Sequence, residues 1–246
     1  MNKDRTLAGK VALVFGGSRG IGAAAARRLA REGADVALTY VSAQNKATDI
    51  VHAIEAEGRS GLAIRADSAD PAAIRSATTE AVDRLGRLDI VVVNAGILRL
   101  GDVQSVSLED LDLMLEINVR GVFLAIQAAA PQLSEGGRVI TIGSNTAVRS
   151  GFPGSSVYSM TKAAVAVMVK GIAVDLAPRG ITVNNIQPGP TRTDMTAEHI
   201  DGLTPMIPLK RVGEPDEIAG LVAYLAGRES GYMTGASLTI DGGLAL

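Results

Sequence analysis

Residues 11–26 (VALVFGGSRGIGAAAA) decide the fold. This stretch starts with five apolar residues, passes through a turn rich in glycine and ends in a run of alanines. A strand, a glycine-rich turn and a helix in this order are typical of a dinucleotide-binding fold, in which the start of the helix receives a pyrophosphate. The same glycines could also form a plain turn, so the rest of the chain has to decide between the two.

Short apolar runs alternate with segments of helical period along the whole chain. Because these runs are apolar throughout, we expect each to be buried on both faces, as in a parallel sheet. We therefore predict one α/β domain over residues 1–246, a doubly wound parallel sheet (Rossmann fold) of about seven strands with helices on both faces. The predicted strands are residues 11–15, 35–40, 62–65, 89–93, 138–142, 181–186 and 237–240, and the predicted helices are 20–31, 44–57, 71–85, 108 to about 133, 157–177 and 215–227.

The composition excludes several classes of protein. The chain has no cysteine and only two histidines, His52 and His199, which lie far apart in the sequence, so disulfides, thiolate chemistry and a metal site are not expected. A formal net charge of −2 and an aromatic content of 3% offer no basis for binding nucleic acid. The first ten residues lack a signal peptide pattern, and no apolar run approaches the roughly 18 residues of a membrane span. We expect a cytoplasmic protein without a membrane partner.

The end of the second predicted strand distinguishes the two nicotinamide cofactors. An acidic residue there binds the ribose 2′-hydroxyl, whereas a basic residue nearby accommodates a 2′-phosphate. No acid occurs in residues 38–42, while Arg19 in the glycine turn and the hydroxyls of Tyr40 and Ser42 are placed to bind a phosphate. NADP is therefore favoured, with NAD still possible, although Arg19 could also be a solvated loop charge.

Tyr158 and Lys162 lie four residues apart and share one face of a predicted helix. A phenol with a pKa of about 10 is a poor acid–base catalyst at neutral pH, and a neighbouring ammonium can lower that pKa. Such a pair is also common by chance. Ser144, at the end of a predicted strand, could hold a substrate oxygen, and Asn118 lies inside an apolar helix, where it could equally be a satisfied buried amide.

These motifs, in order and spacing, resemble those of the short-chain dehydrogenase/reductase family over nearly the whole chain. The matching residues are Gly16, Gly20, Gly22, Asp67, Asn94, Ala95, Gly96, Asn118, Ser144, Tyr158, Lys162, Pro188 and Gly189. The resemblance implies hydride transfer between a nicotinamide cofactor and a carbonyl or alcohol substrate of the ketone or 3-oxoacyl type. It also implies that Tyr158 is the general acid–base, that Ser144 orients the substrate, that Lys162 lowers the phenol pKa and binds the nicotinamide ribose, and that Asn118 holds a water in a proton relay.

The resemblance further implies a cofactor site along the chain. Its expected residues are Gly16, Ser18, Arg19, Gly20, Ile21, Gly22, Tyr40, Ser42, Asp67, Ser68, Asn94, Ala95, Gly96, Tyr158, Lys162, Pro188, Gly189, Thr191 and Thr193. A segment without clear period over residues 188–214 predicts a substrate lid at about residues 190–214, since long loops often cover binding sites. Apolar residues in and near this lid suggest a largely neutral, partly hydrophobic substrate, although several of them could be ordinary packing. They are Val148, Phe152, Met195, Leu203, Met206 and Ile207.

Partner predictions rest on the same resemblance. Similarity points broadly toward 3-oxoacyl-acyl-carrier-protein reductases, which usually have an arginine where this chain has Leu124, although Arg179 remains as a second carrier contact. Binding of an acyl-carrier protein is therefore possible but not favoured. Residues 16–19, 39–40, 67–70, 92–97 and 187–190 also resemble a cyclic-di-GMP-binding homologue of this family, so nucleotide binding without turnover stays as the alternative function. A homotetramer is expected from the family.

Overall fold

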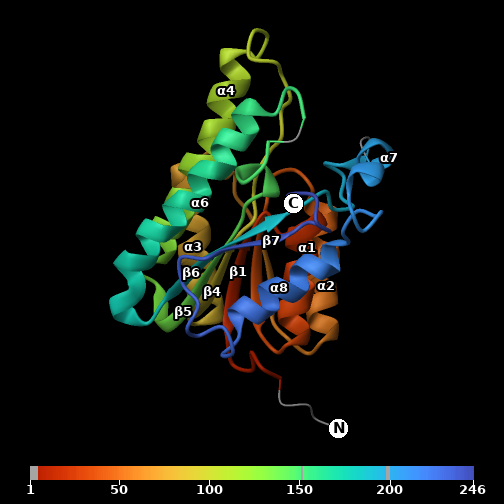
Figure 1. The fold of residues 1–246 in the computed structure, drawn as a ribbon. Coiled ribbons are helices and arrows are strands. Elements are labelled where there is room, and N and C mark those ends of the chain that lie inside the picture. The colour runs from red at the N-terminus through yellow and green to blue at the C-terminus, as the bar shows by residue number, and fades with distance from the viewer. Residues whose placement is uncertain (1–4, 151, 198–199) are drawn as a thin grey trace.

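A seven-stranded parallel sheet forms the centre of the protein, in the order β3-β2-β1-β4-β5-β6-β7 (Figure 1). The computed structural model describes residues 5–150, 152–197 and 200–246. The strands are β1 (Val11–Phe15), β2 (Asp35–Tyr40), β3 (Gly61–Arg65), β4 (Leu88–Val93), β5 (Leu133–Ile142), β6 (Thr182–Pro188) and β7 (Ser237–Ile240). The predicted fold class is confirmed. Because β4 pairs with β1 on the side opposite to β2, the strand order reverses between β1 and β4, and ligands of such sheets bind beside this switch point.

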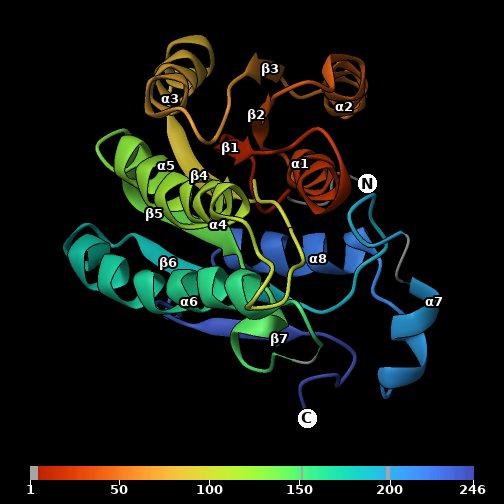
Figure 2. The same cartoon turned by 90° about the horizontal axis from the view of Figure 1, so that it is seen from above.

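Helices cover both faces of the sheet (Figure 2). One layer contains α1 (Gly20–Arg31), α2 (Gln44–Ala56) and α8 (Pro215–Ala226), and the other contains α3 (Pro71–Leu85), α4 (Leu108–Leu115), α5 (Val122–Ala129) and α6 (Ser156–Leu176). Neighbouring residues of one strand enter opposite cores: Val14 packs under α1 and α8, whereas Leu13 packs under α3 and α5. This burial on both faces explains why the strands are apolar throughout.

The predicted long helix over residues 108 to about 133 is not continuous. It is divided into α4 and α5 by a π-helical segment, Glu116–Gly121, and α5 ends at Ala129. Two tertiary contacts fix this segment: the Asn118 side chain binds the backbone of Ile97, and a Cβ on Gly121 would lie 2.4 Å from the Ser68 carbonyl oxygen. The chain also enters β5 at Leu133, earlier than the predicted start at residue 138.

Helix α6 corrects the expectation that no segment of the chain is apolar over the length of a membrane span. Together with the following turn, Ser156–Arg179 is long and apolar enough to span a membrane by length and composition, with a mean hydropathy of 1.4. In this fold it is a helix of the protein core, because Val165 and Val169 pack against the sheet. Its hydropathy is high because the outer face is apolar too: Val167 and Val174 are 67% and 74% exposed.

Candidate active site

The predicted site residues gather at the carboxyl edge of the sheet. The glycine turn follows β1, Tyr40 ends β2, Asp67 and Ser68 follow β3, Asn94–Gly96 follow β4, Ser144 follows β5, and Pro188 ends β6 ahead of Gly189, Thr191 and Thr193. Tyr158 and Lys162 reach this edge from the first two turns of α6, and Asn118 reaches it from the π-helical segment. The fold therefore brings residues that are far apart in the sequence to both sides of the switch point.

The glycine turn has room for glycine only at its closest contacts. A Cβ on Gly22 would lie 2.2 Å from the Gly16 carbonyl oxygen and 2.5 Å from Asn94 Nδ2. Gly16 has a φ of +75°, and its carbonyl accepts a hydrogen bond of 2.8 Å from Asn94 Nδ2. These contacts close the turn tightly over the end of β4 and direct the chain into α1.

The start of α1 fits the pyrophosphate of a dinucleotide. Asp70 and Ser107 cap α3 and α4 with their side chains, whereas Arg19 at the corresponding position of α1 makes no capping hydrogen bond. The first turn of α1 also contains no acidic residue. The N–H groups of Gly20, Ile21 and Gly22 therefore remain available to an anion at the positive end of the helix dipole.

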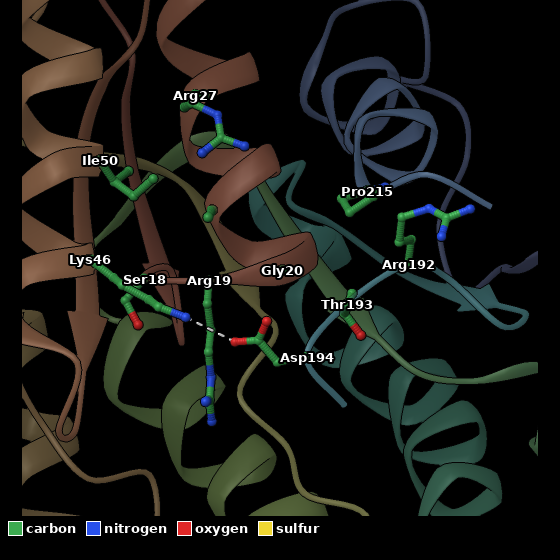
Figure 3. A pocket seen from close by; sticks show the side chains of 11 residues that line it. Ser18, Arg19, Gly20, Arg27, Lys46, Ile50, Arg192, Thr193, Asp194 and Pro215 are labelled. Atoms are coloured by element: carbon green, nitrogen blue, oxygen red, sulfur yellow. Dashed lines mark hydrogen bonds and ion pairs between the residues drawn. The ribbon is translucent and has the colours of Figure 1, made fainter. Parts of the chain in front are cut away.

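A basic pocket adjoins this turn (Figure 3). It encloses about 300 Å³ and is lined by Ser18, Arg19, Gly20, Ala23, Arg27, Lys46, Ile50, Arg192, Thr193, Asp194 and Pro215. Lys46 of α2 forms an ion pair of 3.0 Å with Asp194 at the start of the lid, and Arg192 pairs with Glu214 at 2.9 Å. The four basic side chains outnumber the single acid in the lining, so the pocket favours a phosphate group.

The two predicted catalytic side chains of α6 lie close together. Tyr158 is half-buried, whereas Lys162 is buried. Lys162 is 5% exposed, and its Nζ lies 5.6 Å from the centroid of the Tyr158 ring. The same Nζ donates a hydrogen bond of 3.2 Å to the Ile142 carbonyl oxygen, at the end of β5. Gly96 lies beside it, since a Cβ there would lie 3.4 Å from Lys162 Nζ and 3.3 Å from Asn118 Oδ1.

Burial shifts both pKa values. It raises the pKa of Tyr158 to about 12, an effect that the Ser144 hydroxyl partly offsets, and it lowers the pKa of Lys162 to about 8. Desolvation of the phenolate thus outweighs the effect of the Ser144 hydroxyl, and the expected lowering of the phenol pKa by Lys162 stays a prediction. At neutral pH Tyr158 consequently holds its proton and Lys162 is mostly charged.

Ser144 is arranged as a hydrogen-bond donor. It is 7% exposed, and its Oγ accepts hydrogen bonds from the Thr146 N–H at 3.2 Å and the Thr146 hydroxyl at 3.0 Å. Because Thr146 occupies both acceptor positions of the oxygen, the Ser144 hydrogen is free to point toward another oxygen. No sequence pattern singles out Thr146, since its role depends on the tight turn after β5.

Asn118 is fully buried and held on both sides of its amide. Its Oδ1 accepts from the Ile97 N–H at 2.9 Å, and its Nδ2 donates to the Ile97 carbonyl at 2.9 Å and to Thr161 Oγ1 at 3.3 Å. Thr161 in turn donates to the Tyr158 carbonyl at 2.7 Å. The side chain thus links the end of β4 to α6, as expected of a satisfied buried amide, and the water-holding role stays a prediction.

Comparisons with known proteins agree with this geometry. A family model described as enoyl-(acyl carrier protein) reductase matches residues 16–245. The solved short-chain dehydrogenase/reductase from Serratia marcescens BCRC 10948 is 52% identical, with a TM-score of 0.96 over 98% of this chain and 100% of that chain. This chain belongs to the short-chain dehydrogenase/reductase family. The family is one of oxidoreductases.

Two further members of the short-chain dehydrogenase/reductase family are named for different ligands, NADP and cyclic-di-GMP. A short chain dehydrogenase from Burkholderia cenocepacia J2315, solved in complex with NADP, is 48% identical, with a TM-score of 0.95 over 98% of this chain and 100% of that one. The cyclic-di-GMP-binding biofilm dispersal mediator protein of Escherichia coli (strain K12) is 41% identical, over 95% of this chain and 96% of that protein. Family membership alone therefore leaves open whether this chain catalyses, binds or does both.

The predicted lid segment contains short helical turns in the part of it that the structure describes. Residues 190–214 include α7 (Ile200–Leu203), and Thr191 pairs with Gly213 where the lid starts and ends. The apolar residues predicted to frame the substrate divide into three groups: Val148, Met195 and Met206 are exposed, Phe152 and Leu203 are half-buried, and Ile207 is 1% exposed and packs as core. Sequence analysis did not single out Arg27, Lys46 or Asp194, because they lie in two predicted helices and in the predicted lid, and no local pattern joins them.

Proposed function

We propose that this protein is an NADPH-preferring carbonyl reductase that acts on a ketone or 3-oxoacyl substrate. The observation that carries the proposal is the meeting of Ser144, Tyr158 and Lys162 beside the glycine turn, at the switch point of the sheet. A hydroxyl donor, a protonated phenol and a buried ammonium at one position are the groups that reduction of a carbonyl requires, since negative charge develops on its oxygen.

A nicotinamide cofactor supplies the hydride when bound, and the chain supplies position and a proton. Ser144 donates its free hydrogen to the substrate oxygen and holds the carbonyl beside Tyr158. Tyr158, whose pKa burial raises to about 12, retains its proton at neutral pH and passes it to the oxygen as charge builds there. The charged Lys162 stabilises the phenolate that remains, because the two groups lie in a buried site of low dielectric constant.

Three features support NADPH over NADH, two of them at the part of the proposed cofactor site beside α1 and the end of β2, where the adenosine would lie. No acidic side chain ends β2, where Tyr40 stands. Arg19 lines the basic pocket together with Arg27 and Lys46, and such groups form charge-assisted hydrogen bonds with a phosphate. The relative from Burkholderia cenocepacia was solved with NADP. Asp67 and Ser68 follow β3 beside this end, where we propose that they contact the adenine.

The test is the Tyr158→Phe variant, with Tyr224→Phe on α8 as the matched control. Acid–base groups contribute about 100-fold or more, so reduction of a ketone panel by NADPH should fall by at least that factor while the Kd for NADPH stays within about twofold. Tyr224 is 39% exposed and has no part in the site, so its variant should keep full activity. Retention of the wild-type rate by Tyr158→Phe would refute the catalytic assignment.

A second function, binding of cyclic-di-GMP, is supported by one observation besides the Escherichia coli relative. The basic pocket of Arg19, Arg27, Lys46 and Arg192 is large enough for part of a phosphodiester ligand. Calorimetry should then detect cyclic-di-GMP binding that is weakened by Arg27→Ala and competes with NADPH. Absence of heat at micromolar protein, with NADPH binding intact, would exclude this second function.

We further propose that the protein is a cytoplasmic homotetramer that acts on small molecules. The apolar outer face of α6, with Val167 and Val174 exposed, offers a surface for a second copy of the chain. Light scattering that gives a monomer would contradict this. Binding of an acyl-carrier protein is not favoured, because the charge of Arg179 is already used within the chain. Arg179 donates to the Ala130 carbonyl at 2.6 Å and pairs with Glu135 at 3.0 Å.

A further inference from the structure

The C-terminal residues 240–246 contact three parts of the candidate site. The Gly189 N–H donates to the Ile240 carbonyl at 3.0 Å, and the Leu209 N–H of the lid donates to the Gly242 carbonyl at 3.2 Å. Arg149, in the loop after β5, donates to the Leu244 carbonyl at 2.6 Å and to the Leu246 carbonyl at 3.1 Å. The end of the chain therefore joins the strand end after β6, the lid and the loop that follows Ser144.

Asp241 is the centre of these contacts. Its Oδ1 accepts from the Gly243 N–H at 2.9 Å, and its Oδ2 accepts from the Ala245 N–H at 2.8 Å and from Asn145 Nδ2 at 3.1 Å. The backbone of Gly189 lies so close that a Cβ there would come within 2.5 Å of the Asp241 Cβ. Both carboxylate oxygens are thus occupied, and the side chain cannot move without breaking bonds to two segments.

Asn145 connects Asp241 to the catalytic serine. It directly follows Ser144, starts the 3₁₀ turn Asn145–Ala147 and is 6% exposed. Its carbonyl accepts from the Val148 N–H at 2.9 Å and from the Arg149 N–H at 3.0 Å, so the turn is closed on itself. Thr146 in the same turn donates to Ser144 Oγ. A displacement of Asn145 therefore changes the direction of the Ser144 hydroxyl.

We propose that Asp241 is a positioning residue for Ser144. Its carboxylate holds the Asn145 side chain and, through the turn, aims the Ser144 hydrogen at the substrate oxygen. The inference rests on the proposed carbonyl reduction, and it adds a dependence of catalysis on the last residues of the chain. A shift of about 1 Å in a group that orients a substrate is enough to cost about 100-fold in rate, so the effect is measurable.

The test exchanges the donor and the acceptor of this contact. In Asp241→Asn a single oxygen remains for three donors, Asn145 Nδ2 and the N–H groups of Gly243 and Ala245, so the contact is weakened. In Asn145→Asp two carboxylates face each other, so the bond is lost. The double variant restores it, with an amide at 241 donating to a carboxylate at 145. Each single variant should lower kcat about tenfold or more with the Kd for NADPH within about twofold, and the double variant should recover kcat to within about threefold of wild type.

A purely structural role would give a different result, because the losses in kcat would then follow the melting temperature and would multiply in the double variant. Asp83→Asn, an exposed carboxylate on α3, removes the same charge and should leave kcat unchanged. Losses that multiply, or single variants that keep kcat within about twofold, would overturn the proposal.

Hydrogen exchange of the Thr146 amide gives a readout that needs no turnover. This amide donates to Ser144 Oγ at 3.2 Å, and its exchange should accelerate about tenfold in Asp241→Asn and return toward wild type in the double variant. If the wild-type protein reduces no carbonyl with NADPH, the proposed function fails, while the exchange data still decide whether Asp241 holds the turn. Unchanged exchange in Asp241→Asn would overturn the positioning role by itself.

Discussion

Replacing Gly22 with alanine tests the close packing of the glycine turn. The new Cβ would lie 2.2 Å from the Gly16 carbonyl oxygen and 2.5 Å from Asn94 Nδ2, whereas side-chain carbons keep more than 3.0 Å from such atoms. The turn must therefore move by about 1 Å, at a cost of about 1–3 kcal/mol for an overpacked site. Because the same movement displaces the first N–H groups of α1, binding of NADPH should weaken at least about tenfold, equivalent to about 1.4 kcal/mol.

The free energy of unfolding is measured in urea and the Kd for NADPH by fluorescence titration. Gly220→Ala on α8 is the matched control, because its Cβ would meet nothing nearer than the Arg28 guanidinium at 3.7 Å. A glycine inside a helix costs about 0.5–1 kcal/mol relative to alanine, so the control should be stabilised and bind NADPH normally. A Gly22→Ala protein with unchanged stability and unchanged Kd would refute the packing argument.

Three other predictions follow from charges. Arg19→Ala should raise the KM for NADPH about tenfold or more and the KM for NADH less than about twofold; equal changes would place the 2′-phosphate elsewhere. Since burial lowers the pKa of Lys162 to about 8, kcat/KM for reduction should be constant from pH 6 to 7 and fall above pH 8, and a flat profile to pH 10 would contradict its role. Asp89→Asn should cost about 2 kcal/mol of unfolding free energy at pH 7, measured in urea. Burial opposes the charge of Asp89, but hydrogen bonds from Arg87, the Val11 N–H and Lys10 lower its pKa. This difference should therefore start to shrink as the pH falls below the ordinary pKa of 3.8, and it should be lost once the pH falls through the lowered pKa of the folded protein.

The sheet could be predicted from the sequence because it depends on patterns of neighbouring residues. The apolar run of β1 was predicted with the bounds that the structure shows, and so was the helix start at Gly20. The break in the long helix could not be predicted, since a π-helical turn has the same apolar content as an α-helical one. It depends on contacts of Asn118 with Ile97 and of Gly121 with the loop after β3, which arise only in the folded chain.

The residues of the candidate site could be predicted only where their spacing in the sequence is distinctive. Ser144, Tyr158 and Lys162 could be singled out from their residue types and their spacing. Lys46 and Asp194 pair across 148 residues of sequence, and no local pattern joins them. The direction of the phenol pKa was also out of reach, because it depends on how deeply the fold buries Tyr158, and a YxxxK motif carries no information on burial.

The two ends of the chain differ in their distance from the chemistry, and this matters for anyone who purifies the protein. Figure 1 shows that the described chain leads into β1 from below the sheet, whereas the C-terminus lies near the carboxyl edge of the sheet. Arg149 binds the carbonyls of Leu244 and Leu246, so an affinity tag fused after Leu246 would pull on the loop beside Ser144. A tag on the N-terminal side leaves that loop alone. Activities measured on C-terminally tagged protein would therefore report on the tag as well as on the enzyme.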